Sequence, residues 1–306
     1  MNKNIALHLG AHKTASTYIR RQLRRDPKPI SSDNIKTIFT SNDISALLPG
    51  ELRKAGVTRD ITNVAQQEYY QASAILENMI AATPQNNLLL SEENLIGNCK
   101  SVIAQDCLYF NAHKRLELLS KALTGNNVSL FIAVRETSSF ITSAYCENTR
   151  GGRFCDFRNY SRNIKQFNSL WYDLLKKIKS VFRECPIYVW DHESIFDHRF
   201  MIDLFGKMFS GANDLSFLSR LEVANDIINP SMDAKAFKLL DAASGYCSRS
   251  ELVQLKNFLN KKIIWDEKER FCEWSPIEIN YISSEYQKDL DRIKGDEEFI
   301  FLERIT

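Results

Sequence analysis

Residues 4–17 have the sequence NIALHLGAHKTAST, which contains an apolar run, a loop and the start of an amphipathic stretch. Its first part, Asn4 to Leu9, is a short β-prone run that ends at Gly10 and predicts a buried strand. An amphipathic stretch from about Ser16 to Arg25 follows within a few residues and predicts a helix. The N-terminus is therefore expected to form a strand, a tight loop and a helix.

The loop between this strand and this helix has the character of an anion site. A chain that leaves a buried strand and enters a helix presents several unpaired backbone N–H groups, and the helix dipole adds partial positive charge. Lys13 supplies a full positive charge there, while Thr14, Ser16 and Thr17 supply hydroxyl donors. His12 stands where a Walker A sequence has a glycine before its lysine, so this is not a Walker A loop. The residues predict a site for a phosphate or phosphosulfate group, with an ordinary strand-to-helix turn as the alternative.

Strands and helices alternate along the rest of the first two thirds of the chain. The pattern predicts strands at residues 87–90, 129–134 and 187–190, and helices at about 62–82, 111–123, 138–148 and 160–182. The predicted fold class is α/β, with a doubly wound, mainly parallel sheet and helices on both faces. Beyond about Ser194 the pattern becomes helical, and Ser275-Pro276-Ile277-Glu278 has the form of a capping box. We expect one domain over residues 1–306, with an α/β core at 1–195 and a helical C-terminal cover at 196–306.

A second strand-to-helix junction carries an arginine. Arg135 follows the apolar strand directly, and Ser143 lies two helical turns later. Both side chains are expected to converge on one phosphate group. The alternative is that Arg135 forms a salt bridge with Glu136 or Glu147 at the edge of the sheet.

A third element places carboxylates at the end of a strand. The predicted strand at 87–90 runs into Ser91-Glu92-Glu93. A carboxylate at this edge can take the proton of an acceptor hydroxyl as a general base. The alternative is that both glutamates cap or solvate the following loop.

These three elements resemble those of the sulfotransferases that use 3′-phosphoadenosine 5′-phosphosulfate (PAPS), a family with a P-loop-type fold. Lys13 to Thr17 is similar to the family's K-x-G-[ST]-[ST] loop, with Ala15 in place of the glycine. Residues 135–145 resemble its R-[DN]-P…S-x-Y pattern, with Glu136 and Thr137 in place of the Asp-Pro pair. Residues 90–95 resemble the S-S-E-[ND]-L stretch of bacterial carbohydrate-type members.

The resemblance implies a role for each matched residue. It assigns the 5′-phosphosulfate of PAPS to a loop made of Gly10, Ala11, His12, Lys13, Thr14, Ala15, Ser16, Thr17 and Tyr18. It assigns the 3′-phosphate to Arg135 and Ser143. Lys13 and Glu93 are the implied catalytic residues, with Glu92 or His12 as alternatives to Glu93 for the base. The implied reaction is direct transfer of a sulfuryl group to a hydroxyl of a glycan or glycolipid, with no metal.

Two other functions stay open on the sequence. A P-loop kinase for a small molecule or sugar would need a metal-binding carboxylate at a strand end, and Asp191 is the candidate. A protein that binds a nucleotide without catalysis is the other. Four arginines on the first helix make a basic stripe, interpreted as a solvated face: Arg20, Arg21, Arg24 and Arg25.

Composition limits the remaining classes. The 306 residues are 44% hydrophobic and 11% aromatic, enough for a substantial core. The 40 basic and 38 acidic residues leave a net charge of +2, which gives no indication of a nucleic-acid partner. No secretory signal or membrane-spanning run is apparent, and the seven cysteines contain no CxxC pair, so a cytoplasmic protein with reduced thiols and no metal site is expected.

Overall fold

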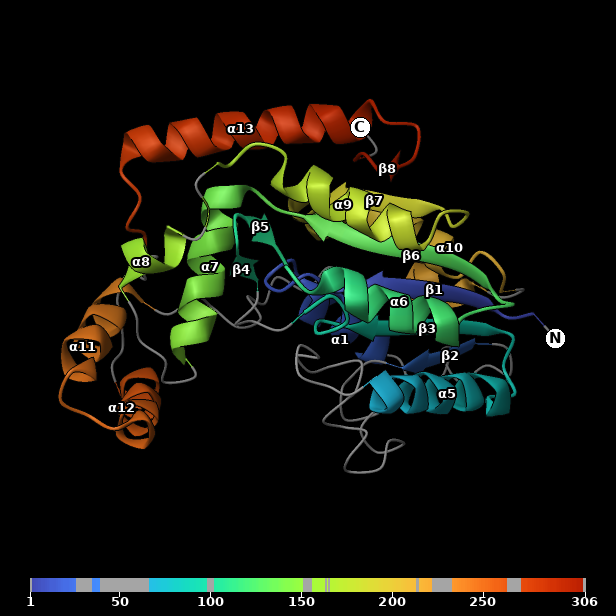
Figure 1. Ribbon diagram of the computed structural model, residues 1–306, viewed down its shortest axis with the longest axis horizontal. Coiled ribbons are helices and arrows are strands. Elements are labelled where there is room, and N and C mark those ends of the chain that lie inside the picture. The colour runs from blue at the N-terminus through green and yellow to red at the C-terminus, as the bar shows by residue number, and fades with distance from the viewer. Residues whose placement is uncertain are drawn as a thin grey trace.

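The computed structural model describes residues 2–25, 35–38, 66–97, 102–150, 156–162, 164, 166–212, 215–221, 233–262 and 271–304. Within these ranges the chain builds a six-stranded sheet whose paired strands all run parallel, in the order β2-β3-β1-β6-β7-β8 (Figure 1). The strands are β1 (Asn4–Leu9), β2 (Ile35–Ile38), β3 (Asn87–Glu92), β6 (Asn127–Val134), β7 (Ile187–Asp191) and β8 (Ile300–Phe301). A short antiparallel pair, β4 (Ile103–Ala104) and β5 (Cys107–Leu108), stands apart from it. The predicted α/β class with a parallel sheet is confirmed.

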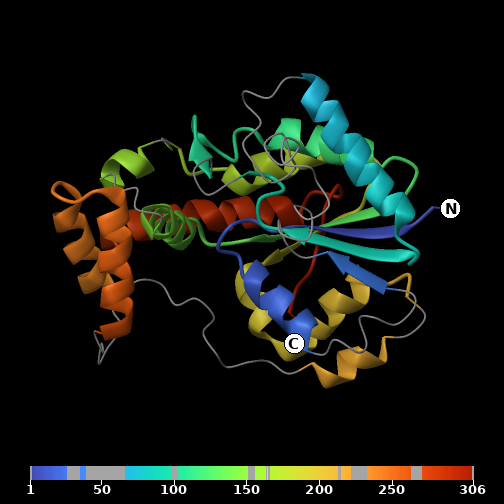
Figure 2. The same cartoon turned by 90° about the horizontal axis from the view of Figure 1, so that it is seen from below.

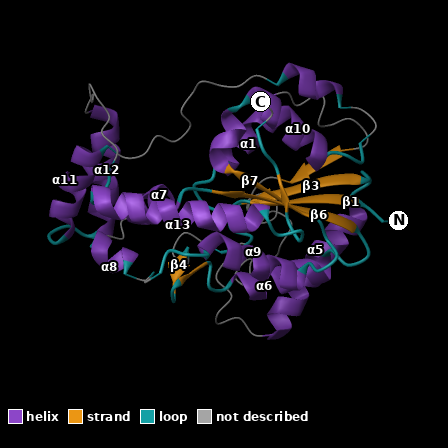
Figure 3. Cartoon of the chain, turned by 90° about the horizontal axis from the view of Figure 1, so that it is seen from above, coloured by secondary structure: helices purple, strands orange, loops and turns teal. Residues whose placement is uncertain are grey.

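Helices cover both faces of the sheet, as Figures 2 and 3 show from opposite sides. One face is covered by α5 (Gln66–Ala82), α6 (Ala112–Ala122), α7 (Thr137–Arg150), α9 (Leu170–Val181) and α13 (Pro276–Lys294). The other face is covered by α1 (Ser16–Arg25), α10 (His198–Met208) and the 3₁₀ helices η1 (His192–Phe196) and η2 (Ser216–Arg220). A parallel sheet needs this double cover because its strands are apolar on both sides. β6 fits that rule, since every residue from Leu130 to Val134 is fully buried.

The part after residue 195 is mostly helical, but it also completes the sheet. β8 pairs with β7, and the backbone N–H of Leu302 donates to the carbonyl of Val189 at 2.7 Å. α13 begins with the predicted capping box at Ser275 and Glu278. By contrast, α11 (Ala234–Ser244) and α12 (Arg249–Lys262) lie away from the strands (Figures 1 and 3). Both α8 (Phe157–Ser161) and α11 pack against Tyr145 of α7. The prediction of a helical cover at 196–306 did not include β8.

Two other local predictions need correction. The single helix expected at about 160–182 is broken into α8 and α9, because Ser169 adopts a left-handed φ of 62° before α9 begins. α9 is instead started by Asp289 of α13, whose carboxylate accepts the backbone N–H groups of Trp171 at 2.8 Å and Tyr172 at 3.2 Å. β2 lies in a stretch where the sequence pattern predicted no strand. The first four residues of the helix expected at about 62–82 lie outside the described residues.

The strand order creates a topological switch point between β1 and β6. β1 is followed by α1 on one face, while its neighbour β6 is followed by α7 on the opposite face. In an open parallel sheet, ligands bind outside the carboxyl ends of two neighbouring strands whose connections leave in opposite directions. The loop at 10–15 and the turn at 135–136 are the segments that flank this point.

Candidate functional site

The loop after β1 contains two residues with a left-handed backbone. Lys13 and Ala15 have left-handed φ angles of 63° and 65°, on either side of Thr14. Alternation of left-handed with right-handed residues directs successive N–H groups to one side, an arrangement that binds anions. The first helical hydrogen bond of α1 runs from Ile19 to Ala15 at 3.1 Å, so the amides of the first turn have no acceptor within the helix.

Ala15 has a left-handed φ angle, and this backbone conformation favours glycine. A left-handed backbone costs an ordinary L-residue about 1–2 kcal/mol, and glycine pays no such penalty. Ala15 nevertheless adopts this conformation and packs its methyl group against the core on the α1 side of the sheet. Ala15 therefore holds a left-handed conformation although it is not a glycine.

Gly10 is required by a close contact between two strand ends. A Cβ atom at this position would lie 3.1 Å from the Cα of Glu93 and 3.2 Å from the Cβ of Ser16. The loops after β1 and β3 therefore touch at Gly10, and this brings Glu93 to the start of α1.

Glu93 is held by donors of α1. Its Oε1 accepts hydrogen bonds from the hydroxyls of Ser16 at 2.9 Å and Thr17 at 3.0 Å, and from Nη2 of Arg20 at 2.9 Å. The side chain of Arg20 is only 14% exposed and also approaches Oε2 of the buried Glu92, at 3.7 Å. The interpretation of the arginines as a solvated stripe is therefore wrong for Arg20, which links both glutamates.

Two other loop side chains turn inward. The hydroxyl of Thr14 donates to the carbonyl of Ala11 at 2.7 Å, and both residues are buried. The ring of Tyr18 is buried against Phe196, with ring centroids 5.4 Å apart. Thr14 thus braces the loop, and Tyr18 can meet a ligand only through its backbone amide.

His12 is buried beside Tyr109. Its backbone N–H donates to the Tyr109 hydroxyl at 2.7 Å, and its Nδ1 lies 3.2 Å from the same oxygen. Burial lowers the pKa of His12, although Glu93 and Asn94 oppose that shift. A neutral imidazole can accept a proton, so His12 keeps the chemistry of a base. No sequence pattern pointed to Tyr109.

The second junction is tied directly to the first. Nη1 of Arg135 donates to the carbonyl of Lys13 at 2.6 Å, and its Nε donates to the hydroxyl of Ser139 at 3.1 Å. Nζ of Lys13 pairs with Oε2 of Glu147 on α7 at 3.2 Å. Ser143 is buried and lies one turn from each of Ser139 and Glu147, on the same helix face. The structure therefore brings Lys13 and Arg135 together, and Ser143 lies on the α7 face whose Ser139 and Glu147 contact them.

Glu136 and Asp191 serve as helix caps. Glu136 accepts the backbone N–H groups of Ser138 at 2.9 Å and Ser139 at 2.8 Å, at the start of α7. Asp191 accepts the backbone N–H of Glu193 at 2.9 Å and the hydroxyl of Tyr286 at 2.6 Å. Asp191, the metal-binding carboxylate that a kinase would need, therefore caps the start of η1. In the part of the chain that the structure describes, no group of three or more His, Cys, Asp or Glu residues could hold a metal ion.

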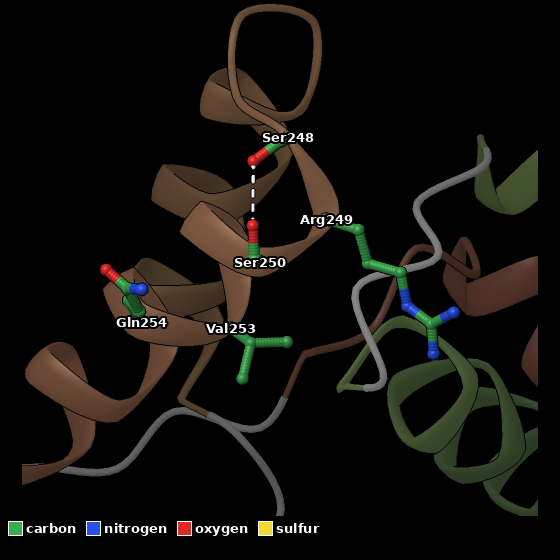
Figure 4. Close-up of a pocket in the computed structure, with 5 residues that line it drawn as sticks. All are labelled: Ser248, Arg249, Ser250, Val253 and Gln254. Atoms are coloured by element: carbon green, nitrogen blue, oxygen red, sulfur yellow. Dashed lines mark hydrogen bonds between the residues drawn. The ribbon is translucent and has the colours of Figure 1, made fainter.

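A surface hollow lies elsewhere, on α12 (Figure 4). Its lining residues are Ser248, Arg249, Ser250, Val253 and Gln254. The hydroxyls of Ser248 and Ser250 lie 3.1 Å apart and the backbone N–H of Ser248 donates to Glu251, so these groups serve the helix start. We therefore assign the candidate site to the sheet edge and not to this hollow.

Comparison with protein-family models, curated proteins and solved structures gave no match to this chain. No helix within the described ranges is both long and apolar enough to cross a membrane.

Proposed function

We propose that this protein is a sulfotransferase that takes a sulfuryl group from PAPS and transfers it to a hydroxyl of an acceptor. The observation that carries the proposal is the 2.6 Å hydrogen bond from Arg135 to the carbonyl of Lys13, which joins two strand-to-helix junctions at the switch point of the sheet. PAPS bears two separate anionic groups, so it needs two neighbouring anion sites. One such junction alone would suit almost any phosphate ligand.

The two junctions divide the donor between them. The 5′-phosphosulfate is expected to meet the N–H groups of the loop, Lys13, and the hydroxyls of Ser16 and Thr17. The 3′-phosphate is expected to meet Arg135 and Ser143, because a guanidinium and a hydroxyl suit the oxygens of a phosphate. Ser143 lies between two α7 residues that already contact Arg135 and the Lys13 side chain, which supports this assignment.

The proposed reaction is a direct displacement at sulfur. An oxygen of the acceptor hydroxyl forms the new bond to sulfur, the bond from sulfur to the 5′-phosphate oxygen breaks, and 3′-phosphoadenosine 5′-phosphate leaves. Lys13 and the loop amides neutralise charge that develops on the leaving oxygen, a role worth about 10²- to 10³-fold per donor. Glu93 receives the proton of the acceptor hydroxyl, worth about 10²- to 10⁴-fold, with Glu92 or the neutral His12 as alternative bases.

The acceptor proposed here is a hydroxyl of a glycan or glycolipid, on the resemblance of residues 90–95 to the carbohydrate-type members. A cytoplasmic location and the absence of a metal requirement belong to the same proposal.

The test is a transfer assay with radiolabelled PAPS and a panel of oligosaccharides and glycolipids. We expect label in a saccharide product with the unchanged protein, and a loss of at least about 100-fold in rate for both Lys13→Ala and Glu93→Gln. Glu117→Gln on α6 serves as the control, since Glu117 is 55% exposed and pairs with His113. Transfer that survives in Lys13→Ala and Glu93→Gln would overturn the assigned roles.

A further inference from the structure

Both proposed catalytic side chains are engaged with partners from the protein itself. Glu93 places one carboxylate oxygen on the hydroxyls of Ser16 and Thr17 at the start of α1. Lys13 directs its ammonium group to Glu147. The groups assigned to the 5′-phosphosulfate are thus already satisfied by two carboxylates.

A carboxylate and a phosphosulfate compete for the same donors because both are anions that accept from N–H and O–H groups. The start of α1 favours negative charge, and Glu93 supplies it from the neighbouring strand end. The hydroxyls of Ser16 and Thr17 each have one proton to donate. They cannot donate to Glu93 and to a phosphosulfate oxygen at the same time.

We propose that Glu93 and Glu147 act as internal counter-ions that the donor must displace, so that donor binding itself releases Lys13 and frees Glu93 to act as the base. This inference rests on the proposed function for the identity of the donor. Its consequence is an order of events: the base becomes available to an acceptor hydroxyl only after the donor has occupied the loop. Arg20 stays in contact with Glu92 and is the residue placed to hold Glu93 nearby.

The inference predicts that removing either negative charge strengthens donor binding. The probe is 3′-phosphoadenosine 5′-phosphate, titrated calorimetrically into the unchanged protein, Glu93→Gln, Glu147→Gln and the control Glu117→Gln. Glutamine keeps the size of the side chain and removes its charge. We expect binding about tenfold tighter in Glu93→Gln and about threefold tighter in Glu147→Gln, with no change in the control. Glu93→Gln would then combine tighter donor binding with loss of transfer.

A double substitution separates the two contacts. The gain from Glu147→Gln should disappear in a Lys13→Ala background, because the lysine whose charge Glu147 neutralises is absent. Thermal unfolding checks that each variant is folded. If Glu93→Gln does not fold, Glu147→Gln carries the test, because Glu147 is 34% exposed and lies on the surface of α7.

The outcomes are distinct for the two proposals. Failure of the unchanged protein to bind the bisphosphate would overturn the proposed function and this inference with it. Binding that is unchanged or weaker in both glutamine variants would overturn the internal counter-ions alone and leave the proposed donor standing.

Discussion

Acid should unfold this protein through histidines that are buried in a neutral form. His8 lies fully buried on β1, with Nδ1 2.7 Å from the hydroxyl of Ser91 and its ring stacked on Trp190. Burial, and secondarily Arg20, lowers the pKa of His8 from 6.5 to about 3. Burial, and secondarily Arg135, lowers the pKa of His192 to the same value of about 3. The unfolded chain therefore binds more protons than the folded protein below pH 6.5.

The size of the effect follows from these values. Stability is fully present above pH 6.5 and is lost as the pH falls toward 3, and at pH 5.5 the two histidines together have removed about 3 kcal/mol. Asp289 acts in the opposite direction, because burial raises its pKa to about 6 and its protonation in the folded state recovers about 1 kcal/mol at pH 5.5. The expected net loss between pH 7.5 and 5.5 is about 2 kcal/mol.

Urea unfolding at pH 7.5 and pH 5.5 measures this loss. In His8→Gln the loss caused by His192 is opposed by the gain from Asp289, so the net loss should fall below about 1 kcal/mol. The control is His113→Gln, at an exposed position on α6, which should keep the full loss. A pH dependence that is the same in His8→Gln and the unchanged protein would refute this reasoning.

Three further substitutions test the local structure by thermal and urea unfolding. Ala15→Gly should raise the free energy of unfolding by about 1 kcal/mol, because glycine accepts the φ of 65°, and a decrease would argue against the left-handed loop. Gly10→Ala should lower it by about 1–3 kcal/mol through contact with the backbone of Glu93, and a neutral result would contradict that close approach. Ser275→Ala should lower the free energy of unfolding by about 1 kcal/mol through loss of the α13 cap. An unchanged free energy of unfolding would show that the capping box does not stabilise the protein.

The elements that local pattern encodes could be predicted from the sequence. The strand and helix around Gly10 were predicted because an apolar run, a tight loop and an amphipathic stretch are contiguous. The capping box of α13 was predicted because all its contacts lie within four residues. The position of Arg135 at the end of β6, directly before α7, was also predicted from the apolar run that precedes it.

The remaining features depend on contacts between distant parts of the chain. The break before α9 arises from a left-handed Ser169 and from a cap by Asp289, which lies 118 residues from Trp171. β8 has only two residues and no periodic pattern. Glu93 contacts Ser16 because β3 lies beside β1 in the sheet. The local sequence of either segment does not indicate which strands are neighbours.

The proposed function requires the site to bind a nucleotide with separate 3′ and 5′ anionic groups. The most direct measurement is calorimetric titration with 3′-phosphoadenosine 5′-phosphate, adenosine 5′-phosphate and ATP–Mg²⁺, repeated on Ser143→Ala. We expect micromolar binding of the bisphosphate, about 10- to 100-fold tighter than the monophosphate, with a smaller ratio in Ser143→Ala. Equal binding of the bisphosphate and the monophosphate, or a preference for ATP–Mg²⁺, would contradict PAPS as the donor.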